Sequence, residues 1–158
     1  MKNKVKGCCL VLVILLVAGC SKVVVKSDSD PNLNMSDLNN FHVRKLPADG
    51  RGIEKIIAAK LVEFGFNATS GEKEASPTAY DAIVTYKDRW MWDITMYMLE
   101  IDIQLRDPET EFVLATGTSY RTSLARKSPE EMVDEVLRDM FTGKVELPEN
   151  IVAEEGKE

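Results

Sequence analysis

The chain has 158 residues, 26 of them acidic and 20 basic, so its formal net charge is −6 at pH 7. An acidic chain binds nucleic acid and anionic lipid headgroups poorly, because both attract basic surfaces. Its length matches one domain. We therefore expect a single domain whose partners do not include nucleic acid.

The N-terminal residues have the pattern of a targeting segment. Three lysines precede an apolar run at 8–17, which is shorter than the ~20 residues of a membrane-spanning helix. The run ends in "LVAGC" (16–20), which resembles the lipobox of bacterial lipoproteins. The resemblance implies that residues 1–19 are a signal peptide, removed before Cys20 once a diacylglycerol has been attached to the Cys20 sulfur.

The residue after Cys20 predicts the destination. In the lipoprotein pattern an aspartate there retains the protein in the inner membrane, and this chain has Ser21. We expect the mature chain to be anchored by its N-terminal lipid in a bacterial outer membrane and to face the periplasm, with the inner membrane as the less favoured alternative. Its net charge is −9 once the three signal-peptide lysines are lost. Cys8 and Cys9 leave with the signal, so no thiol remains for a disulfide or for chemistry.

Two polar segments flank the expected domain at residues 41–142. Residues 20–40 are rich in Ser, Asp and Asn and lack an apolar period, so they are predicted to be a flexible tether. The valines at 23–25 are too few to predict a strand. Residues 143–158 are predicted to be an acidic tail.

The first half of the domain contains a strand and a helix. Residues 41–46 alternate in polarity and predict a short strand. Apolar residues then recur every three or four positions across 51–64, which predicts an amphipathic helix. Asp49 is placed to cap its first turn, and Gly65 to end it in a left-handed conformation.

Strands dominate the second half. Segments 66–69, 80–87, 94–106 and 112–121 are rich in β-branched and aromatic residues or alternate in polarity. The turn at 107–110 contains a proline at its second position and predicts an antiparallel hairpin.

A second helix closes the domain. Ser128 can cap its start, Pro129 suits the first helical position, and Glu131 completes a capping box. The predicted order is β-α-β-β-β-β-α. It indicates a two-layer α+β fold, in which both helices cover one face of a mostly antiparallel sheet.

Both tryptophans lie in the predicted bend before strand 94–106. Alternation places Tyr97 and Leu99 on the helix-covered face, and Met96 and Met98 on the open face. Exposed Trp and Met are typical of interfaces, although loops, the tether or the opposing strand could equally cover these side chains. The hypothetical binding surface comprises Arg89, Trp90, Trp92, Met96 and Met98.

The sequence contains no recognisable catalytic motif. The single histidine, His42, alternates with apolar residues and is expected to face solvent from a strand. Glu100 and Asp102 share one strand face, which makes a glycosidase the third class of function to consider. No cofactor or metal site is expected, because the remaining aspartates lack the glycine-punctuated spacing of calcium loops.

The element order supports a second resemblance. The lipobox, the segment "YDAIVTYKDRWMWDITMYMLEIDIQLRD" and the closing "SPEEMVDEVLRDMF" resemble small, uncharacterised bacterial lipoproteins. The order of elements is similar to envelope accessory lipoproteins, such as penicillin-binding-protein activators and the amino-terminal domain of the Tol translocation protein. These families bind protein partners and lack a catalytic motif. We thus expect a non-enzymatic protein-binding or accessory module; the alternative is a small-molecule or lipid-binding module with a cavity between sheet and helices.

Overall fold

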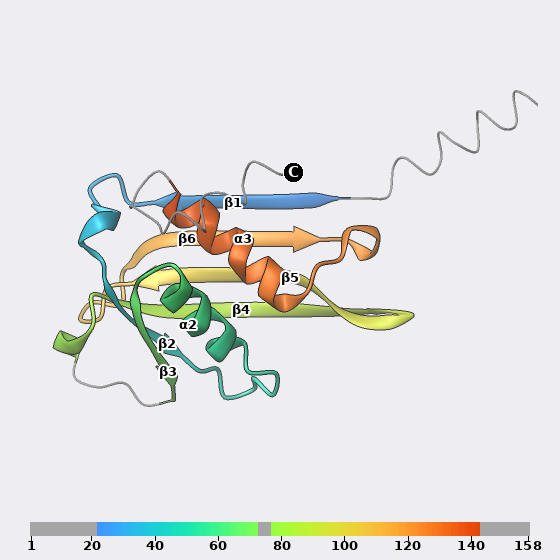
Figure 1. The fold of residues 1–158 in the computed structure, drawn as a ribbon, viewed down its shortest axis with the longest axis horizontal. Coiled ribbons are helices and arrows are strands. Elements are labelled where there is room, and N and C mark those ends of the chain that lie inside the picture. Colours follow the sequence, from blue (N-terminus) through green and yellow to red (C-terminus); the bar gives the residue numbers. More distant parts are fainter. Residues whose placement is uncertain (1–21, 73–76, 143–158) are drawn as a thin grey trace, which may run out of the picture.

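A computed structural model describes residues 22–72 and 77–142. The predicted signal peptide, Cys20 and the predicted acidic tail lie outside these residues. The described residues form a six-stranded sheet with two helices on one face (Figure 1). The strands are β1 (Val23–Ser29), β2 (Asn40–Arg44), β3 (Asn67–Gly71), β4 (Ala82–Asp93), β5 (Thr95–Arg106) and β6 (Val113–Arg121). The helices are α2 (Ile53–Glu63) and α3 (Pro129–Phe141), with single 3-10 turns η1 (Met35–Asp37), η2 (Pro77–Ala79) and η3 (Ser123–Ala125).

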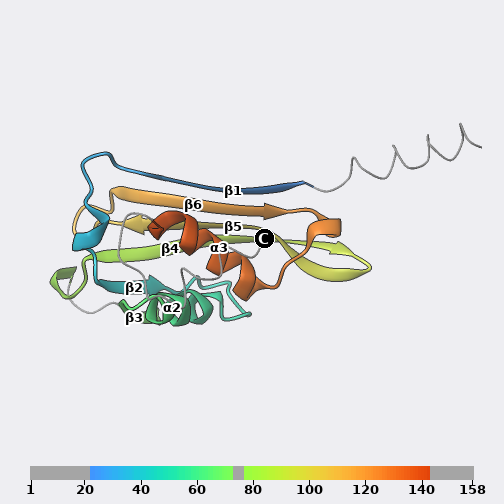
Figure 2. The same ribbon diagram turned by 45° about the horizontal axis from the view of Figure 1, so that its top comes forward.

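The sheet is mixed, with the strand order β1-β6-β5-β4-β2-β3. Strand β2 runs parallel to β3 and to β4, whereas β1, β6, β5 and β4 are paired antiparallel. Both helices lie on the same side of this sheet (Figure 2). The predicted α+β class is confirmed, and the elements from β2 to α3 follow the predicted order.

The prediction of a flexible tether at residues 20–40 is wrong for the part that the structure describes. Strand β1 is paired along its whole length with β6, from Val23 opposite Arg121 to Ser29 opposite Ala115. Local sequence could not reveal this strand, because its hydrogen-bond partners lie about ninety residues further along the chain. The polar side chains of β1 are tolerated because it is an edge strand.

Both helices begin as the sequence predicts. The Asp49 carboxylate accepts hydrogen bonds from the N–H groups of Arg51, Gly52 and Ile53 at 2.7–3.0 Å. Gly65 has a φ of 94°, as expected of a left-handed stop. At α3, Ser128 and Glu131 form the reciprocal capping box.

A continuous apolar core fills the space between the sheet and the helices. It contains residues of β2, β4, β5 and both helices, including Phe41, Ile57, Ile103 and Phe141, each no more than 1% exposed. Helix α3 packs directly onto β6 at Gly117. A methyl group added to this glycine would lie only 2.7 Å from the Met140 sulfur and from a methyl group of Val136. None of the helices in the described ranges is long and apolar enough to cross a membrane.

Candidate functional site

The β4–β5 hairpin projects beyond the rest of the sheet at one end (Figures 1 and 2). Its strands continue to the very tip, where Asp93 pairs with Thr95 and Ile94 alone connects them. Trp90 and Trp92 therefore belong to strand β4 rather than to a bend. Arg126 stabilises the turn: its guanidinium donates hydrogen bonds to Thr95 Oγ1 at 2.6 Å and to the Asp93 carbonyl at 2.8 Å.

Four apolar side chains at this tip are exposed. Trp92 is 68% exposed, Ile94 86%, Met96 49% and Met91 46%. Trp92 and Met96 are direct cross-strand neighbours, as expected if they share a surface. We call Met91, Trp92, Ile94 and Met96 the hairpin-tip cluster. A soluble domain rarely exposes so many large apolar side chains together without using them in an interaction.

The backbone conformation of Ile94, at the hairpin turn, is also energetically unfavourable. Its φ is 62°, in the left-handed region that a β-branched residue avoids, at a cost of about 1–2 kcal/mol. Glycine or asparagine would make the same turn more cheaply and without exposing an apolar side chain. Stability alone thus does not explain an isoleucine here, and such outliers concentrate at functional positions.

Only part of the predicted binding surface is available. Trp92 and Met96 are exposed, as the hypothetical surface requires, but Met98 is 1% exposed and belongs to the core. Trp90 is half-buried against that core, with the Arg51 guanidinium 4.1 Å from its ring centre. Arg89 forms an ion pair with Glu100 at 2.6 Å.

A β-bulge explains why Met98 faces inward. Arg89 pairs with Glu100 and Trp90 pairs with Met98, so Leu99 is an extra residue in β5. An extra residue reverses the in-and-out alternation of everything before it. Met98 thereby shares the core with Ile101, whereas Tyr97, predicted to face that core, instead lies beneath the Arg126 guanidinium at 4.5 Å.

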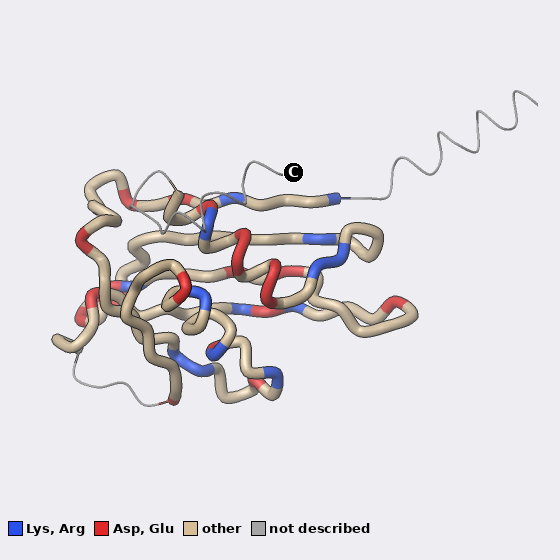
Figure 3. The backbone as a smooth tube through the Cα atoms, in the orientation of Figure 1, with Lys and Arg blue, Asp and Glu red and all other residues tan. Residues whose placement is uncertain are grey.

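Two further parts of the chain reach the same end of the sheet. The Lys22 carbonyl accepts a hydrogen bond from the Thr122 N–H at 3.2 Å, which joins the start of β1 to the segment after β6. Leu124 on η3 is 68% exposed, and Val23 is 45% exposed. Lys and Arg positions mark the start of β1, the end of β6 and the segment before α3 (Figure 3). Sequence reasoning missed Ile94 and Leu124, since nothing in the linear pattern groups them with Trp92.

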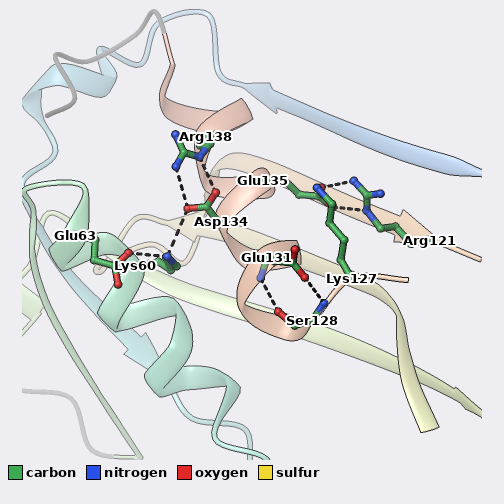
Figure 4. Close-up of polar contacts among 9 residues, drawn as sticks. All are labelled: Lys60, Glu63, Arg121, Lys127, Ser128, Glu131, Asp134, Glu135 and Arg138. Carbon is green, nitrogen blue, oxygen red and sulfur yellow. Dashed lines mark hydrogen bonds and ion pairs between the residues drawn. The ribbon is translucent and has the colours of Figure 1, made fainter. Parts of the chain in front are cut away.

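An ion-pair network fixes the segment that holds Arg126 (Figure 4). The Glu135 carboxylate on α3 accepts hydrogen bonds from the guanidinium of Arg121 and the hydroxyl of Ser119, and from Lys127 Nζ at 3.2 Å. Burial by itself raises the pKa of Glu135, but the bonds from Arg121 and Ser119 outweigh it and lower the pKa. The carboxylate consequently stays ionised and ties both ends of the segment 121–127 to α3.

The open face of the sheet carries a groove of about 570 Å³. Its polar lining residues include Arg44, Thr85, Lys87, Asp102, Gln104, Arg106, Glu111, Thr116 and Thr118. Most of these groups form hydrogen bonds with one another. For example, the Arg44 guanidinium donates two hydrogen bonds to the Glu111 carboxylate, at 2.7 and 3.2 Å. The groove lies on the face opposite to the one for which a ligand cavity was predicted.

The two carboxylates considered for catalysis do not converge. Asp102 accepts a hydrogen bond from the Thr118 hydroxyl at 2.6 Å, and Glu100 is paired with Arg89. His42 is 3% exposed, so the expectation of a solvent-facing histidine is wrong. Its Nδ1 lies 2.8 Å from the Thr69 hydroxyl, and its ring packs against Tyr80. Within residues 22–72 and 77–142 there is no group of three or more potential metal ligands.

A second buried acid lies at the start of α2. Glu54 is 3% exposed, and burial together with a hydrogen bond to Asp49 raises its pKa. Burial opposes ionisation of Asp49 as well, but bonds from the Tyr86 hydroxyl and the Arg51 N–H hold the pKa of Asp49 far below its usual range. The pKa values of the two groups are therefore shifted in opposite directions, which favours the carboxylate form of Asp49 and the protonated form of Glu54.

This arrangement predicts a pH-dependent effect of Glu54→Gln. The pKa of Glu54 is higher in the folded state than in the unfolded state, so protonation of Glu54 stabilises the fold. This stabilisation is complete at pH values below the unfolded-state pKa, and it is lost as the pH rises through the folded-state pKa. Glutamine keeps a donor for Asp49 without needing that proton. We expect the variant to melt above the wild type at pH 8 and close to it at pH 4. A melting temperature that is lowered equally at both pH values would contradict the assignment.

Comparison with known proteins identifies the fold. No protein-family model matches this chain, and no curated protein matches it. A PelC dodecamer from Paraburkholderia phytofirmans is 16% identical, with a TM-score of 0.57 over 75% of this chain and 98% of that one. A DUF4136 family protein from Bacteroides thetaiotaomicron is 10% identical (TM-score 0.49; 75% and 94% covered). TolB from Acinetobacter baumannii is 15% identical (TM-score 0.41; 76% and 31% covered). At 16% identity, PelC shares the fold with this chain.

Proposed function

We propose that this chain is a lipid-anchored, periplasm-facing accessory protein of the bacterial envelope, which acts by binding another envelope component rather than by catalysis. The anchor would be Cys20, in a sequence that resembles a lipobox. The observation that carries the binding function is the hairpin-tip cluster, whose four apolar side chains are each at least 46% exposed. Met adapts its shape to a partner and Trp contributes strongly to binding energy.

The structure also changes which residues are proposed to bind. Met98 is removed from the predicted surface because it is buried, and Trp90 because Arg51 and the core cover it. Met91 and Ile94 take their places. Arg89 remains at the edge of the surface, where its ion pair with Glu100 leaves its side chain 59% exposed.

The anchor is tested by Cys20→Ser, with Cys9→Ser as the matched control. In cells supplied with a clickable palmitate, we expect the wild type and Cys9→Ser to be labelled and to sediment with outer membranes. Cys20→Ser should be unlabelled, and either unprocessed or released from the membrane. Labelling of Cys20→Ser at the wild-type level would refute the lipid anchor.

The binding surface is tested by photo-crosslinking in cells. A photoreactive residue at Met91, inside the cluster, should give adducts that disappear when Trp92→Ala and Met96→Ala are added. The matched control carries the photoreactive residue at Val62 of α2, which is 54% exposed but lies away from the hairpin, and should give no such adducts. Adducts at Met91 that persist in the double variant would show that the cluster is not the binding surface.

A further inference from the structure

We propose that the envelope component bound by the hairpin-tip cluster is the lipid bilayer itself, so that the tip inserts into the same membrane leaflet that holds the acyl chains of Cys20. The inference rests on the proposed lipid anchor and adds a second point of contact. The domain would then be oriented on the membrane instead of hanging freely from its N-terminus.

The connectivity of the chain brings the anchor and the tip to one end of the domain. Lys22 is bonded to Thr122 through both its N–H, at 3.0 Å, and its carbonyl, at 3.2 Å. Arg126, four residues further on, holds the hairpin turn through Thr95 and Asp93. Cys20 precedes Lys22 by only two residues, so a lipid on Cys20 would be tethered to Lys22 by two Cα–Cα steps of about 3.8 Å each.

The side chains at this end match the chemistry of a membrane interface. Trp92, Ile94 and Met96 form the tip itself, and Leu124 and Val23 expose apolar side chains on the neighbouring segments. Tryptophan favours the interface because its ring is apolar and its N–H is polar. Arg126, which donates to the hairpin turn, and Lys22, at the start of β1, lie at the same end of the domain, where they can meet lipid phosphates. The acidic group in the turn, Asp93, is paired with Arg126 at 3.3 Å.

The shape and size of the cluster favour lipid over a folded protein. A stable protein interface buries about 800 Å² on each partner and is complementary in shape to it. The hairpin-tip cluster is four side chains on a projecting hairpin, not a groove or a broad flat face. A weak apolar contact suffices for lipid, because the nearby anchor makes insertion an intramolecular step with a high effective concentration.

The two tryptophans provide an internal reporter and control. Trp90→Phe leaves Trp92 as the only tryptophan, and Trp92→Phe leaves Trp90. Each acylated mature protein is reconstituted into vesicles of phosphatidylethanolamine and phosphatidylglycerol, with or without bromine atoms on the acyl chains. We expect brominated lipid to quench most of the Trp92 fluorescence and little of the Trp90 fluorescence. Equal, weak quenching of both would overturn the inference.

A second reporter covers the case in which Trp90→Phe disturbs the fold. Ile94→Cys introduces a thiol at a site that is 86% exposed, and the mature chain has no other free cysteine once Cys20 is acylated. An environment-sensitive dye on this thiol should shift to the blue and brighten on vesicles, whereas the same dye at Val62→Cys should not. An unchanged spectrum at both sites would overturn the inference.

These results separate the inference from the proposed function. If the acylated protein floats with vesicles but Trp92 is not quenched, the anchor stands and tip insertion is wrong. If Met91 then crosslinks to a protein in cells, the binding surface stands with a protein partner in place of lipid. If Cys20→Ser is labelled like the wild type, the anchor and the argument built on it both fail.

Discussion

Glu135→Gln is expected to lower the free energy of unfolding by about 3 kcal/mol, because it removes the carboxylate that pairs with a largely buried guanidinium. The side chains of Arg121 and Glu135 are only 12% and 14% exposed. Glutamine has nearly the same shape but cannot balance the positive charges of Arg121 and Lys127. The segment that positions Arg126 behind the hairpin would lose its attachment to α3, so docking through the tip should weaken too.

The measurement is urea denaturation of Glu135→Gln beside Asp139→Asn, an exposed carboxylate on the same helix. The control should change the free energy of unfolding by less than about 0.5 kcal/mol. Because the pKa of Glu135 is lowered on folding, the carboxylate stabilises the protein above its unfolded pKa and ceases to do so as the pH falls through the folded value. The difference in the free energy of unfolding between the wild type and Glu135→Gln should therefore become smaller at acidic pH. A variant as stable as the wild type at pH 7 would show that the network contributes nothing.

Gly117→Val is expected to cost about 3 kcal/mol through overpacking. The first carbon of any side chain at this position would meet Met140 and Val136 at 2.7 Å, so α3 must move away from β6. Valine favours strands, and an unconstrained site would be stabilised by it. A loss of stability thus isolates the contact with α3.

Two variants make this test specific. Gly50→Ala is the matched control, since a methyl group there meets nothing within 4 Å, and it should be neutral or stabilising by up to about 1 kcal/mol. Met140→Ala removes the side chain that a Cβ at position 117 would meet. Its cost in stability should therefore be smaller in the Gly117→Ala background than in the wild type. Strict additivity of these two substitutions in thermal melts would mean that the contact is not made in solution.

Local patterns predicted the regular elements well. The helix at α3 follows from Ser128, Pro129 and Glu131 because a cap acts within four residues of itself. Asp49 and Gly65 bound α2 for the same reason. The two-layer α+β class follows from the order of these elements, since each amphipathic helix requires an apolar sheet face.

Pairings between distant segments were the main error. The sequence of β1 predicts a polar tether, but the structure pairs this segment with β6 as a strand. The sequence also left open whether Trp90 is covered, and in the structure Arg51, 39 residues earlier in the chain, packs over its ring. In both cases the deciding partner is far away in the chain, so that no window of sequence contains it.

For the candidate site, the sequence by itself determined that both tryptophans and three methionines gather near one hairpin, and that a cysteine follows an apolar run. The tertiary structure alone decided which of these side chains reach solvent. A single extra residue, Leu99, places Met98 in the core. Ile94 is exposed at the turn next to Trp92 and Met96, and Met91 is exposed on the opposite face of the hairpin. The physical reason is that alternation along a strand assigns faces only while the pairing stays regular, and regularity is a property of two strands together.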